Sequence, residues 1–425
     1  MFILKIIAMK YFKRISDIEL QHKLESSGGL LIRGIKACGK TESAKQFAKS
    51  VIELDQNDQV PLLMETAPKR LLLGDTPRLI DEWQEYPKIW NYIRHEIDNR
   101  NDSAQFILTG SSTPDENIKM HSGAGRFTIL DMHTMSWLEL GFSSGKVSLK
   151  ALFENQEIQI NDHPTDLEFI VERLITGGFP GLIEKNISQA TYINRAYVDL
   201  LSDIDMSRVS NIKRDPIKVR NLLRSLARNS ATIVDLSTIE SDIRFYELKD
   251  ISRPTIYNYL DALERLMIID NQSAWNTHIR SSSQLRKSPK RHFADVAIAV
   301  AALGLDKESL LNDLKFTGFL FESLAIHELR VYAQANDAKV FHYRDSSGLE
   351  VDAIVQKQNS DWSAFEIKLG TGQIDEAAES LKKFASIIDH KRVDPPKSLN
   401  IITGTGISYT RLDGINVISL SSLGY

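Results

Sequence analysis

The segment "GIKACGKT", residues 34–41, carries the residue types best suited to bind phosphate, because it fits the pattern G-x-x-x-x-G-K-[ST]. An apolar run precedes it and a helical pattern, "KTESAKQFAKSVIEL", begins within it. Glycines let the backbone wrap phosphate groups, and amides at a helix N-terminus stabilise their negative charge. We expect Lys40 to reach the β- and γ-phosphates and Thr41 to ligate Mg²⁺. The predicted nucleotide-binding residues here are Gly34, Ile35, Lys36, Ala37, Cys38, Gly39, Lys40 and Thr41.

Two acids end the next apolar run, "PRLIDE", residues 77–82. In a nucleotide hydrolase, Asp81 would hold the Mg²⁺ shell and Glu82 would polarise the attacking water. A pair of acids that merely opens a loop is the alternative interpretation. The phosphate-binding pattern upstream favours the catalytic one.

A third run, "AQFILTGSS", ends in hydroxyl groups, and Thr109, Ser111 or Ser112 could sense the γ-phosphate or orient water. Arg126 follows in "SGAGRF" and is a candidate arginine finger, which would act in trans within a ring of subunits. A plain surface arginine explains Arg126 equally well.

A second group of charged residues lies near the C-terminus, in "LEVDAIV" and "AFEIKL". Because side chains alternate along a strand, Asp352 can face Glu366 and Lys368 across a hairpin. Two carboxylates can hold Mg²⁺ and a lysine can orient water, which is the chemistry of a metal-dependent nuclease. Gln373 is a weaker additional candidate. Ordinary salt bridges on a sheet are the alternative.

Two stretches between these sites are candidates for DNA contact. In "SRPTIYNYLDALERL", Ser252 is a predicted N-cap and Pro254 lies in the first turn of a helix whose N-terminal side chains could reach DNA. The basic run "HIRSSSQLRKSPKRH" contains no acid and could contact phosphates. The predicted DNA-contacting residues are Arg253, Thr255, Tyr257, Asn258, Arg280, Arg286, Lys287, Lys290 and Arg291. Upstream, Arg220, Arg224 and Arg228 share one helical face, although pairing with nearby acids or a solvated loop would also explain these charges.

Composition limits the class of protein. The chain has 425 residues, which is too long for one core, and its net charge of −4 excludes a globally basic nucleic-acid binder but not local basic surfaces. A single cysteine permits no internal disulfide, which favours a reducing compartment. The apolar run "AIAVAALGL" is far shorter than a membrane span and the N-terminus has no signal-peptide pattern. We therefore expect a cytoplasmic protein without membrane contact.

The elements that must position these residues alternate at first between strand-like and helical patterns, which predicts a parallel sheet covered by helices. Strands are expected near residues 29–34, 77–82 and 104–112, with a helix over 86–100. Mostly helical patterns follow, and the chain ends in a second α/β segment.

The segments "GIKACGKT", "LLLGDTPRLIDEWQE", "FILTGSS" and "GAGR", followed by "GGFPG", "RDPIKVRNLLRSLARNSAT", "RPTIYNYLDALERL", "SPKRHFAD" and "FHYRDSSGLEVDAIV", occur in this order. Together they resemble bacterial and archaeal AAA-type P-loop ATPases of the archaeal primordial group. The resemblance implies a winged helix and a C-terminal domain similar to PD-(D/E)XK nucleases, in which Glu322 matches the helix acid beside the metal. Some members of that group are associated with four-way DNA junctions. Residues 51–71 look shorter than usual, which leaves the strand after the first helix uncertain, and Met9 resembles the usual start.

Taken together, the residues and the resemblance predict an α/β protein with four parts: an AAA-type ATPase core (1–135), a helical lid (136–211), a winged helix (212–275) and a restriction-endonuclease-like domain (276–425). The expected function is an ATP- and Mg²⁺-dependent motor or remodeller of branched DNA such as Holliday junctions. It would act as a homo-oligomeric, hexameric ring, and nuclease activity at the C-terminal site stays open. The alternative is an ATP-controlled signalling switch whose nuclease-like domain only binds a partner or DNA.

Overall fold

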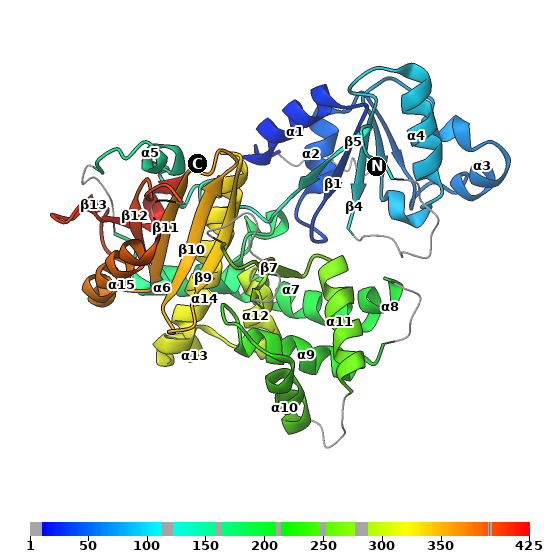
Figure 1. Cartoon of the computed structure of the whole chain (residues 1–425). Coiled ribbons are helices and arrows are strands. Elements are labelled where there is room, and N and C mark those ends of the chain that lie inside the picture. The colour runs from blue at the N-terminus through cyan, green and yellow to red at the C-terminus, as the bar shows by residue number, and fades with distance from the viewer. Residues whose placement is uncertain are drawn as a thin grey trace, which may run out of the picture. The chain divides into compact units, whose positions relative to one another are not determined.

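The structure is a computed structural model that describes residues 11–111, 122–158, 164–209, 214–246, 252–276, 288–389, 391 and 393–425. Its contacts divide the described chain into two compact units (Figure 1). The first comprises residues 11–33, 39–110 and 122–132, and the second comprises residues 34–38, residue 111 and the described residues from 133 onward. Within the described residues, no helix combines the length and the apolar character needed to cross a bilayer.

The first unit is built on a five-stranded sheet in the order β2-β3-β4-β1-β5, and every pairing in it is parallel. Its strands are β1 (Gly29–Arg33), β2 (Ser50–Glu53), β3 (Arg78–Asp81), β4 (Phe106–Gly110) and β5 (Phe127–Asp131). Its helices are α1 (Ser16–Ser26), α2 (Lys40–Phe47), α3 (Val60–Thr66) and α4 (Ile89–Arg100). The predicted parallel sheet is confirmed, and β2 is the strand that the sequence left uncertain.

Apolar side chains explain this arrangement. The strands β1, β3 and β4 are buried almost throughout, as expected for parallel strands covered on both faces. Helix α4 turns Ile89, Trp90, Ile93 and Ile97 into the core, where they pack in one cluster with Phe106. The ring of Trp90 also stacks on the ring of Phe127 in β5, with the ring centroids 4.2 Å apart. The core thereby fixes the carboxyl ends of the strands, where the predicted catalytic residues lie.

The second unit begins with helices and a short β-ribbon. These helices are α5 (Leu149–Phe153), α6 (Leu167–Thr176), α7 (Ile187–Leu200), α8 (Met206–Arg208), α9 (Pro216–Arg228), α10 (Leu236–Tyr246), α11 (Arg253–Arg265), α12 (Val296–Leu303) and α13 (Lys307–Asn312). The ribbon pairs β7 (Ile269–Gln272) with β8 (Lys290–Phe293) in antiparallel fashion. Ser252 caps α11 by accepting from the Thr255 amide, and Pro254 lies in the first turn, as predicted.

A six-stranded mixed sheet in the order β13-β14-β12-β11-β10-β9 completes the second unit, with α14 (Leu314–Gln334) and α15 (Ile374–Ile387) contacting its strands (Figure 1). Its strands are β9 (Ala338–Arg344), β10 (Glu350–Lys357), β11 (Trp362–Lys368), β12 (Leu399–Thr403), β13 (Tyr409–Thr410) and β14 (Asn416–Ser419). A separate pair joins β6 (Val147–Ser148) to β15 (Leu423–Gly424). The β9–β10 register shifts between Val351 and Ile354, so the regular pairing is interrupted at Asp352 and Ala353. Such interruptions, of which β-bulges are one form, can re-aim side chains.

Candidate nucleotide site and C-terminal charged cluster

The phosphate-binding pattern forms the connection between β1 and α2. Strand β1 ends at Arg33 and α2 begins at Lys40, so the segment lies between a buried strand and a helix N-terminus, as the pattern requires. Gly39 takes the N-cap position with φ 102°, a left-handed conformation that favours glycine. Lys40 is buried in the first turn of α2. The backbone amides at this helix start can therefore face a phosphate group.

Two hydroxyl groups converge on the carboxylate of Asp81. Thr41 donates from Oγ1 to Oδ1 of Asp81 at 2.8 Å, and Thr109 donates to the same oxygen. The strand order explains this, because β4, which carries Thr109, lies between β1 and β3. The carboxyl ends of these parallel strands meet at one edge of the sheet, where open α/β sheets bind ligands. Hydroxyl and carboxylate oxygens are the ligands that Mg²⁺ prefers, so Thr41 and Asp81 fit the ion of a bound nucleotide.

Glu82 follows β3 directly and has a left-handed backbone with φ 51°. The side chain of Gln84 donates from Nε2 to Oε2 of Glu82. Burial raises the pKa of the Glu82 carboxyl, while the hydrogen bond from Gln84 and the charge of Lys40 oppose the rise without cancelling it. A carboxylate with a raised pKa is a better proton acceptor near neutral pH. Nothing in the sequence pattern pointed to Gln84.

The remaining predictions for the ATPase part of the chain are placed as follows. Ser111 comes directly after β4, and Ser112 lies outside the described residues. Arg126 is partly exposed and forms an ion pair with Asp98 of α4, with Nε 2.7 Å from Oδ1. Any role of Arg126 in a neighbouring subunit requires that it leave Asp98.

The structure brings together the predicted residues of the C-terminal site. Lys368 lies 2.7 Å from Glu366 Oε2 and 3.5 Å from Asp352 Oδ2. Asp352 also accepts a hydrogen bond from the amide of Ile367 at 2.8 Å. Glu366 accepts from Ser380 of α15 at 3.1 Å. Gln373 is exposed in the turn before α15.

Lys290 belongs to this cluster, and the prediction that it lies on an exposed phosphate-binding loop is wrong. It begins strand β8 with only 2% of its surface exposed. Its ammonium nitrogen lies 2.8 Å from Glu322, 2.6 Å from Glu350 and 3.5 Å from Asp352. The three acids come from α14 and β10, far away in sequence, so a local basic run could not reveal them. Strand alternation in "KRHF" could have indicated that Lys290 is buried, since Lys290 and His292 share the buried face and Arg291 between them is only partly buried.

The electrostatics of the cluster follow from burial and from these lysines. Burial raises the pKa of Glu322 and of Glu366, and the charge of Asp352 raises it further. For Asp352, burial acts upward, but Lys290 and Lys368 together hold its pKa below the ordinary value. With Lys290 and Lys368 in place, no three His, Cys, Asp or Glu side chains among the described residues are grouped as metal ligands. Ammonium groups lie against the oxygens of Asp352 and Glu366, and their predicted role as Mg²⁺ ligands stays a prediction.

The predicted DNA contacts on α9 and α11 are largely paired with acids. Arg253 pairs with Glu240, Arg228 with Asp242, and Arg220 with Asp199 and Asp203. Tyr257 is exposed, whereas Thr255 and Asn258 are partly buried, and Asn258 accepts a hydrogen bond from Arg214. Arg291 donates to the carbonyl of Val234, and Arg280, Arg286 and Lys287 lie outside the described residues. Arg291 lies in strand β8 and is half-buried there, and its predicted contact with DNA stays a prediction.

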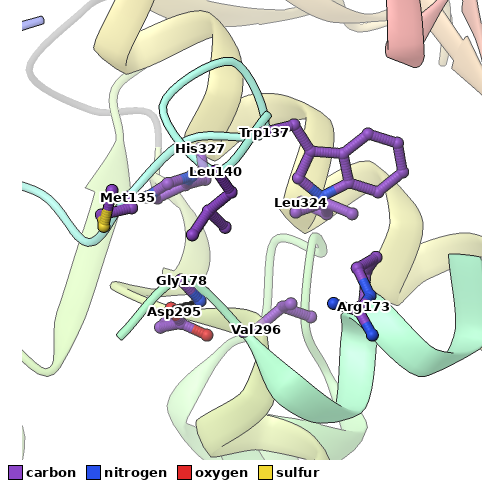
Figure 2. Close-up of a pocket in the computed structure, with 10 residues that line it drawn as sticks. Met135, Trp137, Leu140, Arg173, Gly178, Asp295, Val296, Leu324 and His327 are labelled. Atoms are coloured by element: carbon purple, nitrogen blue, oxygen red, sulfur yellow. Dashed lines mark hydrogen bonds between the residues drawn. The ribbon is translucent and has the colours of Figure 1, made fainter. Parts of the chain in front are cut away.

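A small pocket in the second unit lies among Trp137, Arg173, Asp295 and His327 (Figure 2). It has room for roughly one water molecule. Two of its polar side chains have partners within the fold: Asp295 accepts from the amides of Gly178 and Ala297, and His327 lies 3.0 Å from the Thr134 hydroxyl. The glycine pair in "GGFPG" is required here, because a Cβ at Gly178 would lie 2.3 Å from the Met135 carbonyl. This pocket is a packing feature rather than a substrate site.

Comparisons with known proteins bear on the first unit most directly. An AAA domain family matches residues 26–141, and two domain families of unknown function match residues 167–309 and 317–423. Uncharacterized proteins of Mycobacterium tuberculosis and Mycobacterium bovis are each 21% identical over 370 residues, which is 86% of this chain and 75% of theirs.

Among solved structures, a Walker-type ATPase of Pyrococcus abyssi, PABY2304, aligns with 69% of this chain and 96% of its own at 14% identity and a TM-score of 0.43. A DNA polymerase III gamma subunit-related protein of Thermotoga maritima aligns with 60% of this chain and 100% of its own at 12% identity and a TM-score of 0.22. These scores are too low to transfer any property. The match to the AAA domain, together with the position of Lys40 and the convergence of Thr41 and Asp81, supports a P-loop ATPase in the first part of the chain.

Proposed function

We propose that this protein hydrolyses ATP and uses the energy to act on DNA. The observation that carries the ATPase part is the contact of Thr41 and Thr109 with Asp81 at the carboxyl edge of a parallel sheet, beside a phosphate-binding loop. These groups come from the start of α2 and from the ends of β3 and β4, and only the folded sheet brings them together. Such an arrangement is typical of nucleotide hydrolases.

Each residue has a distinct task in this proposal. Lys40 and the loop amides from Gly34 to Thr41, with Ser111 nearby, bind the phosphates. Thr41 and Asp81 would hold Mg²⁺, which would neutralise charge on the phosphate oxygens. Glu82 accepts a proton from the attacking water, and Gln84 holds the Glu82 carboxylate in place. The raised pKa of Glu82 supports this assignment, since a weakly acidic carboxyl releases its proton less readily once it has accepted it.

The DNA part of the proposal rests on α11. Its capped N-terminus carries Arg253 and Tyr257 at the surface, which is where a recognition helix presents side chains to DNA. We propose that residues 212–275 form a winged-helix module, that residues 136–211 are a lid, and that the preferred substrate is branched DNA. The chain would act as a cytoplasmic hexameric ring, in which Arg126 exchanges Asp98 for the nucleotide of a neighbouring subunit.

The C-terminal domain, residues 276–425, contributes DNA binding in this proposal. No cleavage step is assigned to it, because Lys290 and Lys368 lie against the carboxylates that would have to hold a metal ion. Nicking of DNA that Asp352→Ala abolishes would add a nuclease activity to the proposal.

A second candidate function is an ATP-controlled switch that binds a protein partner. It is favoured by the ion pairs of Arg220, Arg228 and Arg253, because an arginine that already faces a carboxylate gains less from a DNA phosphate. This candidate predicts slow hydrolysis, tightly retained nucleotide and no salt-sensitive affinity for DNA.

A binding titration separates the two candidates. Four-way junction and linear duplex DNA of equal length are titrated with the full chain at two salt concentrations, for the wild type and for Arg253→Ala. The DNA proposal predicts tighter binding to the junction, weaker binding at the higher salt concentration, and a loss of affinity in the variant. Equal and negligible binding of both DNAs would favour the switch.

A further inference from the structure

The cluster around Asp352 contains a cation of its own. The Lys290 ammonium has three carboxylates within 3.5 Å, on Glu322, Glu350 and Asp352. Lys368 lies on the other oxygen of Asp352 and on Glu366. Both oxygens of Asp352 thus face an ammonium group, and the positions from which a divalent cation would be bound are in use.

Lys290 is held in this position from both sides of its strand. Its neighbour His292 is fully buried and lies 3.0 Å from both the Ser323 hydroxyl of α14 and the Gln272 side chain of β7. Between Lys290 and His292, the backbone of Arg291 pairs with Thr232. The Arg291 guanidinium donates a hydrogen bond to the Val234 carbonyl at 2.9 Å. The ammonium group therefore projects from a strand that is fixed on two faces, unlike a lysine on a solvated loop.

Because the site is buried, the Lys290 ammonium and the carboxylates around it depend on one another for charge compensation. A buried ammonium without partners is strongly unfavourable, and so are buried carboxylates without a counter-charge. The side chains of Glu322 and Asp352 are each only 11% exposed, so solvent cannot replace Lys290 as their partner. Removal of its charge would leave a set of carboxylate oxygens suited to a hard divalent cation.

We propose that Lys290 is the resident cation of the carboxylate cluster formed by Glu322, Glu350 and Asp352, and that it keeps divalent cations out of this site. The cluster is then a closed, metal-independent element of the fold, and replacing Lys290 with a neutral side chain opens a site for Mg²⁺ or Mn²⁺. This inference is independent of ATP hydrolysis, since it concerns only the second unit.

The test is Mn²⁺ binding to the nucleotide-free full chain, measured by titration calorimetry and by the loss of the free-ion paramagnetic resonance signal. Lys290→Met is compared with the wild type, with the double variant K290M/D352N, and with Lys307→Met. Lys307 is a matched control, because it also bridges two carboxylates, Glu168 and Glu172, but at the surface. Lys290→Met is expected to gain one Mn²⁺ per chain, at least about tenfold tighter than any binding by the double variant. The wild type and Lys307→Met are expected to show no such gain.

Thermal unfolding gives a second readout. Lys290→Met is expected to melt earlier than the wild type in chelator and to recover when Mn²⁺ is added, whereas matched ionic strength from KCl should not restore it. A natively folded Lys290→Met that gains no Mn²⁺ would overturn the proposal.

A comparison that does not require the lysine variant to fold is wild type against Asp352→Asn. Equal Mn²⁺ stoichiometry in the two supports a closed cluster. One additional Mn²⁺ in the wild type, lost in Asp352→Asn, would show that the cluster binds metal despite Lys290 and would refute the proposal.

Discussion

Glu82 is the residue whose replacement should separate chemistry from nucleotide binding. It lies one residue beyond Asp81, and Gln84 donates a hydrogen bond to its carboxylate. In Glu82→Gln the side chain keeps its shape but cannot accept a proton. Thr41, Thr109 and Asp81 keep their mutual contacts, because the Glu82 side chain takes part in neither of these hydrogen bonds.

The expected magnitude follows from the role of a general base. Loss of proton transfer at the transition state typically costs 10²- to 10⁴-fold in rate, which corresponds to about 2.7–5.4 kcal/mol in activation free energy. Nucleotide affinity should change by less than about threefold, because the interaction is made in the transition state and not in the ground state. The variant should therefore lose kcat and retain KM.

The assay is steady-state ATP hydrolysis with a parallel equilibrium measurement of ATP binding. Glu85→Gln serves as the matched control, since Glu85 is an exposed acid three residues further on. If Glu82→Gln hydrolyses ATP within about threefold of the wild-type rate, the general-base assignment is wrong. If it loses ATP binding instead, Glu82 acts in the ground state and the assignment is equally wrong.

Three further predictions test other contacts. Thr109→Val removes a buried hydrogen-bond donor to the Asp81 carboxylate. Because hydrogen bonds to charged groups contribute about 1.5–3 kcal/mol, kcat/KM should fall on the order of 10- to 100-fold. An unchanged kcat/KM would show that Thr109 does not contribute to the site. Gln84→Ala removes a hydrogen bond that lowers the pKa of Glu82, so the pKa of Glu82 should rise. Because the base works only when deprotonated, the acidic limb of the kcat–pH profile should move to higher pH. An acidic limb that stays in place would contradict this coupling. Ser252→Ala removes the N-cap of α11 and should lower the free energy of unfolding by about 1 kcal/mol in denaturant titrations, whereas an equal stability would mean that the cap contributes nothing.

Local patterns were sufficient for the first site. The loop before α2, the acids after β3 and the hydroxyl at the end of β4 each follow a short apolar run, so the chain order alone located Lys40, Asp81 and Thr109. What the sequence could not supply is the strand order that puts Thr109 against Asp81. Gln84 was missed because a single polar side chain in a turn has no periodic signal.

The C-terminal site shows where such reasoning ends. Strand alternation was sufficient to bring Asp352, Glu366 and Lys368 together, because they lie on adjacent strands of one hairpin. Lys290 was assigned to DNA because its sequence neighbours are basic, whereas its real partners are 32 residues away at Glu322 and on β10. A run of basic residues indicates that most of its side chains are exposed, but a single lysine in the run can still be buried when acids from other elements pair with it.

The measurement that tests the central proposal most directly is the ATPase rate of the full chain without DNA, with linear duplex and with a four-way junction, for the wild type and Lys40→Ala. We predict Mg²⁺-dependent hydrolysis that Lys40→Ala abolishes and that the junction stimulates more than the duplex does. Hydrolysis that persists in Lys40→Ala would contradict the nucleotide site, and a wild-type rate unchanged by either DNA would contradict the action on DNA.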